Sequence, residues 1–155
     1  MKSPQQWFDA YAESHQNATN LKIHMVCVPV IYYSILGLLL CIPRGILRDH
    51  LNLGLPILEN WATVVSLFVL LFYLRLNLVI FLRMFLFTLI CIVLNSLVND
   101  FTNNFYVSLT LFVIAWIGQF YGHKIEGKKP SFFQDLQFLL IGPPWVFEKL
   151  FKPSK

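Results

Sequence analysis

The chain has 155 residues, of which 57% are hydrophobic and only 13% are charged, and its mean hydropathy is +0.62. This composition excludes a soluble domain with a charged surface and predicts an integral membrane protein, and the long apolar runs described below predict that it is all-α. We expect one membrane-embedded catalytic domain over residues 1–155, with no room for a separate soluble module. The three cysteines all fall in apolar stretches and are expected to pack rather than to form disulfides or a metal knuckle.

The N-terminal segment, residues 1–22, predicts a short amphipathic helix followed by a bend. Ser3 can cap this helix, Pro4 suits its first turn, and Gln6 stands three residues after the cap, as in a capping box. The polar run "QNATN" that follows is expected to break the helix. No cleavable signal peptide is visible in this segment.

Four apolar runs follow in chain order. The first contains no charge and, at about 1.5 Å per residue, covers roughly 28 Å, which is close to the thickness of the hydrocarbon core. "PRGILRDHLNLGLP" then predicts a loop or a helix lying in the interface, and the next apolar stretch is long enough for two spans joined by a tight turn at "LRLN". The polar link "NDFTNN" precedes the last run. We therefore predict spans at residues 24–42, 57–74, 78–98 and 105–121.

The C-terminal segment, residues 131–150, predicts a helix too short to cross the bilayer. Ser131 and Gln134 have capping-box spacing, and Gly142 with Pro143 and Pro144 is expected to end the helix. About ten residues suit a re-entrant or interfacial helix, with Trp145 and Phe147 at the depth of the lipid headgroups.

The distribution of charge orients the predicted bundle. With four spans, both termini lie on one side, and that side is expected to be cytoplasmic because it carries most of the Lys and Arg residues. The net charge of +4 then forms a one-sided basic rim, which suits anionic headgroups or fatty carboxylates and not nucleic acid. The rim residues are Lys2, Lys22, Arg75, Lys124, Lys128, Lys129, Lys149, Lys152 and Lys155, against Arg44 and Arg48 in the opposite loops.

Three of the four histidines fall on this cytoplasmic side. His15 lies on the N-terminal helix, His24 at the mouth of the first span and His123 at the end of the fourth, while His50 lies in the opposite loop. Three imidazoles suit zinc, copper, iron or nickel and leave positions open for a substrate. His15 and His24 are nine residues apart, so they reach one centre only if the chain bends at "QNATN".

A polar stripe runs along the fourth span. Trp116, Gln119, His123 and Glu126 follow the three-then-four spacing of one helix face, and polar groups in a span are costly enough to suggest function. Plainer interpretations stay open: the histidines as interfacial anchors, Trp116 and Gln119 as contacts between helices, and Glu126 as a solvated partner of Lys129.

Two blocks carry a resemblance to a known family. "WFDAYAESHQNATNLKIHMVCVPVI" contains Tyr11, His15, Asn20, His24 and Pro29, and the second block is "WIGQFYGHKIEGKKPSFFQDLQFLLIGPPWVFE". Together they give H-x4-N-x3-H followed by Q-x3-H-x2-E-x3-P, which resembles the signature of the yeast-type 2-hydroxy fatty acid dioxygenases. The stretch between the blocks is similar only in length and hydrophobicity.

The resemblance implies an Fe(II)-dependent enzyme that uses O2 in the α-oxidation of 2-hydroxy fatty acids to chains one carbon shorter. It implies a place in the endoplasmic reticulum of a eukaryote or the inner membrane of a bacterium, among membrane lipids, and it leaves open a homo-oligomer and the fourth iron ligand. The implied iron ligands are His15, His24 and His123. Glu126 is a further candidate catalytic residue or direct ligand, and the candidates for supporting the ligands or binding substrate are Asn20, Gln119, Lys124 and Lys129.

Three other functions compete with this one. A membrane scaffold or lipid-binding protein would use its histidines as anchors and bind no metal. A haem protein would hold its haem without covalent attachment, because the chain lacks CxxCH. A zinc-dependent hydrolase would need a general base, for which Glu126 is the candidate.

Overall fold

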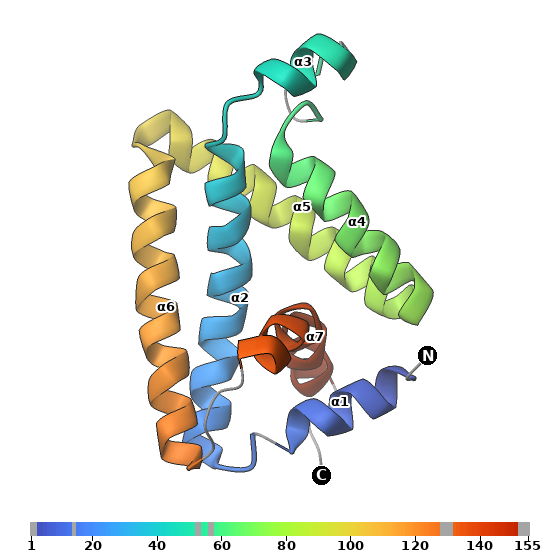
Figure 1. Ribbon diagram of the computed structural model, residues 1–155, viewed down its shortest axis with the longest axis vertical. Coiled ribbons are helices and arrows are strands. Elements are labelled where there is room, and N and C mark those ends of the chain that lie inside the picture. Colours follow the sequence, from blue (N-terminus) through green and yellow to red (C-terminus); the bar gives the residue numbers. More distant parts are fainter. Residues whose placement is uncertain (1–2, 14, 52–53, 56–57, 128–131, 152–155) are drawn as a thin grey trace. The chain divides into compact units, whose positions relative to one another are not determined.

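The computed structural model describes residues 3–13, 15–51, 54–55, 58–127 and 132–151, with the side chains of 46, 51 and 132–138 left aside. The described residues are all-α, as the sequence predicts, and most of them lie in helices (Figure 1). These helices are α1 (Pro4–Ala12), α2 (Ala18–Leu40), α3 (Gly45–Leu51), α4 (Trp61–Leu76), α5 (Leu78–Phe101), α6 (Asn104–Glu126) and α7 (Phe132–Phe151).

The chain divides into two compact units. One comprises Met1–Tyr32 and Phe112–Lys155, and the other comprises Tyr33–Leu111. The long helices α2 and α6 each contribute one part to either unit. We call the first the terminal unit and the second the central unit.

Among the described residues, three helices are long and apolar enough to cross a membrane, which indicates an integral membrane protein. They are α2, α5 and α6, with 23, 24 and 23 residues and mean hydropathies of 2.1, 2.5 and 1.4. The fourth predicted span corresponds to α4, which is apolar but has only 16 residues. At about 1.5 Å per residue α4 covers roughly 24 Å, so it reaches less far than the other three.

The terminal unit begins as the sequence predicts. The Ser3 side chain accepts from the backbone N–H of Gln6, and the Gln6 side chain accepts from the Ser3 N–H, which closes a capping box on α1. The chain leaves the helix after Ala12, and Asn17 caps α2 by accepting the N–H of Thr19 at 2.9 Å. The predicted break is therefore confirmed. The helix α2 nevertheless begins at Ala18, six residues before the predicted span, because the Asn17 cap allows its polar first turn to be helical.

The C-terminal helix does not end where the sequence suggests. The prediction that Gly142, Pro143 and Pro144 stop it is wrong, because α7 continues from Phe132 to Phe151. Ile141 and Val146, on either side, are 1% and 0% exposed. This burial offsets the hydrogen bonds that the two prolines remove. Ser131, the predicted cap, lies outside the described residues.

Packing against α1 explains why α7 stays helical. The two helices pair within the terminal unit, and Trp145 of α7 is 2% exposed. Its ring lies 4.8 Å from that of Tyr11 on α1, between centroids. The ring of Trp145 thus has protein neighbours, and its expected place at headgroup depth stays a prediction.

The central unit is built on the hairpin of α4 and α5, which lie side by side in Figure 1. Asn77 forms the whole turn: its N–H donates to Tyr73 O at 3.0 Å, and its side chain accepts the N–H of Val79 at 2.7 Å. The predicted tight turn at "LRLN" is therefore confirmed. The three cysteines of the chain are free thiols.

A buried polar group holds the central unit's parts of α2, α5 and α6 together. Asn95 and Ser108 are both 0% exposed, and Ser108 Oγ donates to Asn95 Oδ1 at 3.3 Å. Asn95 Nδ2 also donates to the carbonyl oxygen of Tyr33 on α2 at 3.2 Å. Gly37 makes this approach possible, because a Cβ there would overlap both polar side chains. Hydrogen bonds and the close packing of small residues join helices in lipid, where the hydrophobic effect does not drive helices together.

Candidate metal site

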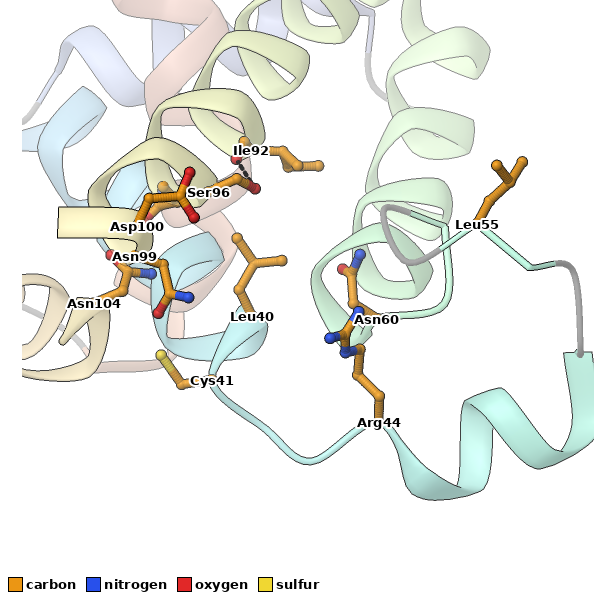
Figure 2. Close-up of a pocket in the computed structure, with 11 residues that line it drawn as sticks. Leu40, Cys41, Arg44, Leu55, Asn60, Ile92, Ser96, Asn99, Asp100 and Asn104 are labelled. Carbon is orange, nitrogen blue, oxygen red and sulfur yellow. Dashed lines mark hydrogen bonds between the residues drawn. The ribbon is translucent and has the colours of Figure 1, made fainter. Parts of the chain in front are cut away.

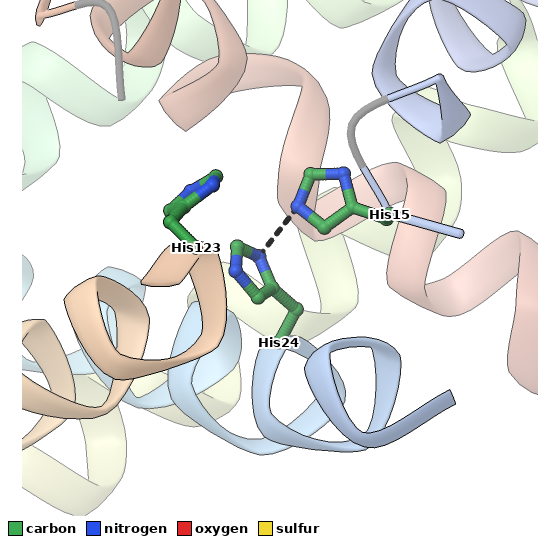
Figure 3. A group of neighbouring side chains, drawn as sticks. All are labelled: His15, His24 and His123. Atoms are coloured by element: carbon green, nitrogen blue, oxygen red, sulfur yellow. Dashed lines mark hydrogen bonds between the residues drawn. The ribbon is translucent and has the colours of Figure 1, made fainter. Parts of the chain in front are cut away.

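Three histidines from three segments of the terminal unit meet in one cluster. His15 lies in the break between α1 and α2, His24 lies in the second turn of α2, and His123 lies in the last turn of α6. Figure 3 shows the three rings facing one another. They are 6%, 1% and 9% exposed, and one nitrogen from each lies within 4.8 Å of the others. The predicted convergence of these three histidines is thus present, and His50, on α3, does not belong to the cluster.

The hydrogen bonds of the cluster show which nitrogens are available. His15 Nδ1 lies 2.7 Å from the carbonyl oxygen of Tyr11, and because a carbonyl only accepts, that nitrogen carries the proton. His15 Nε2 therefore presents a lone pair, and His24 Nδ1 faces it at 2.8 Å as the donor. His24 Nε2 is then unprotonated and also presents a lone pair, and it is buried with no hydrogen-bond partner.

A buried imidazole lone pair without a donor is unfavourable, because it has lost its hydration and gained nothing in return. A cation at the centre of the cluster would satisfy it. His15 and His24 each have one unprotonated nitrogen, Nε2, and His15 already gives its other N–H to a carbonyl, as metal-binding histidines do. These donors therefore fit a transition-metal ion.

Two glycines on α6 bring His123 to its partners. Gly118 and Gly122 form a G-x-x-x-G pair on the face that meets α2. A Cβ on Gly118 would lie 2.7 Å from Cys27 Sγ, and one on Gly122 would overlap the side-chain oxygen of Asn20. Only glycine permits so close an approach, and it places the last turn of α6 against the start of α2.

An aromatic wall encloses His15. The Tyr11 ring stacks on its imidazole, with centroids 4.2 Å apart and planes 8° from parallel. Trp145 of α7 lies 5.6 Å from the same imidazole, and Lys149, one turn further on, lies 5.6 Å above the Trp145 ring. The stacked Tyr11 ring and the tilted Trp145 ring restrict the imidazole plane and keep water away from it.

Glu126 fastens the segment that carries His15. Its carboxylate accepts the N–H of Gln16 at 2.8 Å, the N–H of Asn17 at 3.0 Å and Asn20 Nδ2 at 2.9 Å. Two of these donors are backbone N–H groups next to the N-terminus of α2, which have no partner inside the helix, and the third is a side chain of its first turn. A negative charge is favoured there by the helix dipole. We refer to these contacts of Glu126 as the carboxylate clamp.

The other predicted site residues divide by position. Asn20 is fully buried and Gln119 is 6% exposed, one turn before His123. Lys124 is exposed beside the cluster, and Lys129 lies outside the described residues. The roles assigned to these four, and the catalytic role of Glu126, stay predictions.

Sequence reasoning assigned no role to several residues that build the site. Tyr11 and Trp145 contribute the aromatic wall, and Gly118 and Gly122 bring α6 close to α2. The glycine pair carried a usable signal, since G-x-x-x-G in an apolar helix indicates close helix packing. Tyr11 was marked only as a position of the first family block, and its contacts with the histidines depend on the fold.

The central unit contains a separate cavity of about 550 Å³, which Figure 2 shows. Amide side chains dominate its polar lining, with Arg44 and Asp100 as its charged groups. Its remaining lining is apolar and includes Leu40 and Ile92. None of the described residues that line this cavity is a histidine, and it shares no residue with the three-histidine cluster.

A buried group of three imidazoles, two of them on long apolar helices, defines an integral membrane protein with a three-histidine site that can hold a metal ion. The chain belongs to the Mpo1-like family, described as 2-hydroxy-palmitic acid dioxygenase Mpo1-like, whose model matches residues 1–153. This match confirms the family that the two sequence blocks indicate. Comparisons with curated proteins and with solved structures return no match.

Proposed function

We propose that this protein is an Fe(II)-dependent dioxygenase that cleaves 2-hydroxy fatty acids by α-oxidation to acids one carbon shorter. The observation that carries the proposal is the buried cluster of His15, His24 and His123, with its unsatisfied nitrogen on His24. The family supplies the reaction type and the 2-hydroxy acid. At a metal-dependent site the activation of O2 needs a redox-active ion, and zinc is not one, which favours iron over zinc.

The three histidines would hold the iron through nitrogens that face the centre of the cluster. Three protein ligands would leave positions for the substrate and O2, and the metal would supply the redox chemistry that activates oxygen. The reaction needs no external reductant, because R–CH(OH)–COOH and O2 balance as R–COOH, CO2 and H2O. An α-hydroxy acid suits such a site because its carboxylate and hydroxyl can bind side by side.

The protein's own residues would bind and orient the lipid. Exposed Lys124 would attract the carboxylate toward the site, and buried Gln119, one turn before His123, would hydrogen-bond the acid's polar head. The acyl chain would lie along apolar helices in the bilayer. The aromatic wall would exclude water from the reacting carbons, and the carboxylate clamp would keep His15 in place.

The test is oxygen uptake by detergent-purified protein, loaded anaerobically with Fe(II) and given 2-hydroxypalmitic acid. We expect consumption of O2 and a fifteen-carbon acid detected by mass spectrometry, both abolished in His123→Ala. Palmitic acid without the hydroxyl is the matched control and should not be consumed. Turnover that continues without oxygen would overturn the proposal and favour the zinc hydrolase.

A further inference from the structure

Tyr11 contacts two members of the cluster through two different groups. Its carbonyl oxygen accepts from His15 Nδ1 at 2.7 Å, and its hydroxyl lies 3.3 Å from His24 Nδ1. The side chain is 3% exposed and stacks on His15. One residue thus contacts the Nδ1 atom of both histidines, and the nitrogen of a ligating imidazole that does not bind the metal usually has such a partner.

The two hydrogen bonds are not equivalent. His15 Nδ1 keeps its carbonyl partner whether or not the cluster holds a cation. His24 Nδ1 now faces His15 Nε2 at 2.8 Å, and it would lose that acceptor once His15 Nε2 turned to an ion. The hydroxyl oxygen of Tyr11 already lies within reach to accept the same proton.

We propose that Tyr11 is the positioning residue of the metal site: its hydroxyl takes over the His24 Nδ1–H when His15 binds the ion. His24 would then keep its Nδ1 proton and offer Nε2, now without a partner, to the metal. This inference rests on the proposed function, because it assumes that the cluster binds a metal. It adds that the His24 tautomer is set by the Tyr11 hydroxyl.

Gly142 of α7 leaves room for the Tyr11 hydroxyl. A Cβ at this glycine would lie 3.1 Å from the hydroxyl oxygen and 3.1 Å from Val28 Cγ1, which is tighter than ordinary contact. The glycine of the "GPP" segment thus lets α7 approach without displacing the hydroxyl. A methyl group there would press on Tyr11 and Val28, and no histidine atom is among its three nearest neighbours.

The test is anaerobic titration of the purified full-length chain with Co(II), followed by visible absorption, and with Fe(II), followed by elemental analysis. The main variant is Tyr11→Phe, which keeps the ring and the carbonyl and removes only the hydroxyl. The control is Tyr73→Phe, which removes a hydroxyl from a tyrosine that is 0% exposed in the central unit. Gly142→Ala is the second variant, which displaces the hydroxyl and keeps it present.

We expect Tyr11→Phe to weaken metal binding about 10- to 100-fold and to shift the Co(II) spectrum, while the metal-free protein melts within a few degrees of the parent. Gly142→Ala should act in the same direction, and Tyr73→Phe should bind like the parent. Parent-like affinity and spectrum in Tyr11→Phe would overturn the role of Tyr11 and leave the proposed function standing. If Tyr11→Phe does not fold, the same result in Gly142→Ala would do so. A parent chain that binds neither metal would overturn the proposed function together with this inference.

Discussion

Removal of the carboxylate clamp should loosen the segment that carries His15. Glu126→Ala deletes the acceptor of two backbone N–H groups and of the Asn20 side chain, at distances of 2.8 to 3.0 Å. A hydrogen bond to a charged group contributes about 1.5–3 kcal/mol where it is buried. Glu126 is half-exposed, so water replaces part of this contribution, and we expect a total loss of about 2 kcal/mol.

The assay is thermal unfolding in detergent, with Fe(II) affinity measured on the same samples. A loss of about 2 kcal/mol corresponds to roughly 4–8 °C in Tm for a chain of this size. Glu126→Gln, which keeps one acceptor oxygen, should lose less. Glu13→Gln removes an exposed carboxylate nearby and serves as the control. If Glu126→Ala matches the parent in both Tm and iron affinity, the clamp has no role in holding His15.

Three further substitutions test the packing around the site and in the central unit. Gly122→Val should force α6 away from Asn20, costing about 1–3 kcal/mol of stability and weakening metal binding, measured by Tm and metal titration. Asn95→Leu should cost only about 0.6–1.7 kcal/mol and leave metal content unchanged, since its hydrogen bonds lie within the central unit. Trp145→Ala should cost about 3–5 kcal/mol by opening a void beside His15, seen as a large fall in Tm. An unchanged Tm in Gly122→Val or Trp145→Ala, or lost metal in Asn95→Leu, would contradict these assignments.

The convergence of the histidines could be predicted because it depends on coarse features of the sequence. Hydropathy places the helices, and the uneven distribution of Lys and Arg assigns their ends to one side. The polar break before His24 then allows His15 to turn back toward it. The tight turn at Asn77 was predictable for a related reason, since a single polar interruption in a long apolar stretch leaves one place to reverse direction.

The detail of the site could not be predicted because its partners are distant in sequence. Glu126 binds backbone N–H groups about 110 positions earlier, whereas its sequence neighbours suggested a lysine partner. The same limit explains the error at Gly142 and the prolines after it. Local propensity ends a helix there, but burial of Trp145 and Val146 against the rest of the unit keeps it continuous.

The most direct measurement is the metal content of protein purified anaerobically, by elemental analysis, for the parent and for His15→Ala, His24→Ala and His123→Ala. We predict about one iron per chain in the parent and little in any variant, because three imidazoles share one ion. Zinc in place of iron would contradict the dioxygenase assignment. Iron retained in all three variants, or none in the parent after reconstitution with Fe(II), would contradict the site itself.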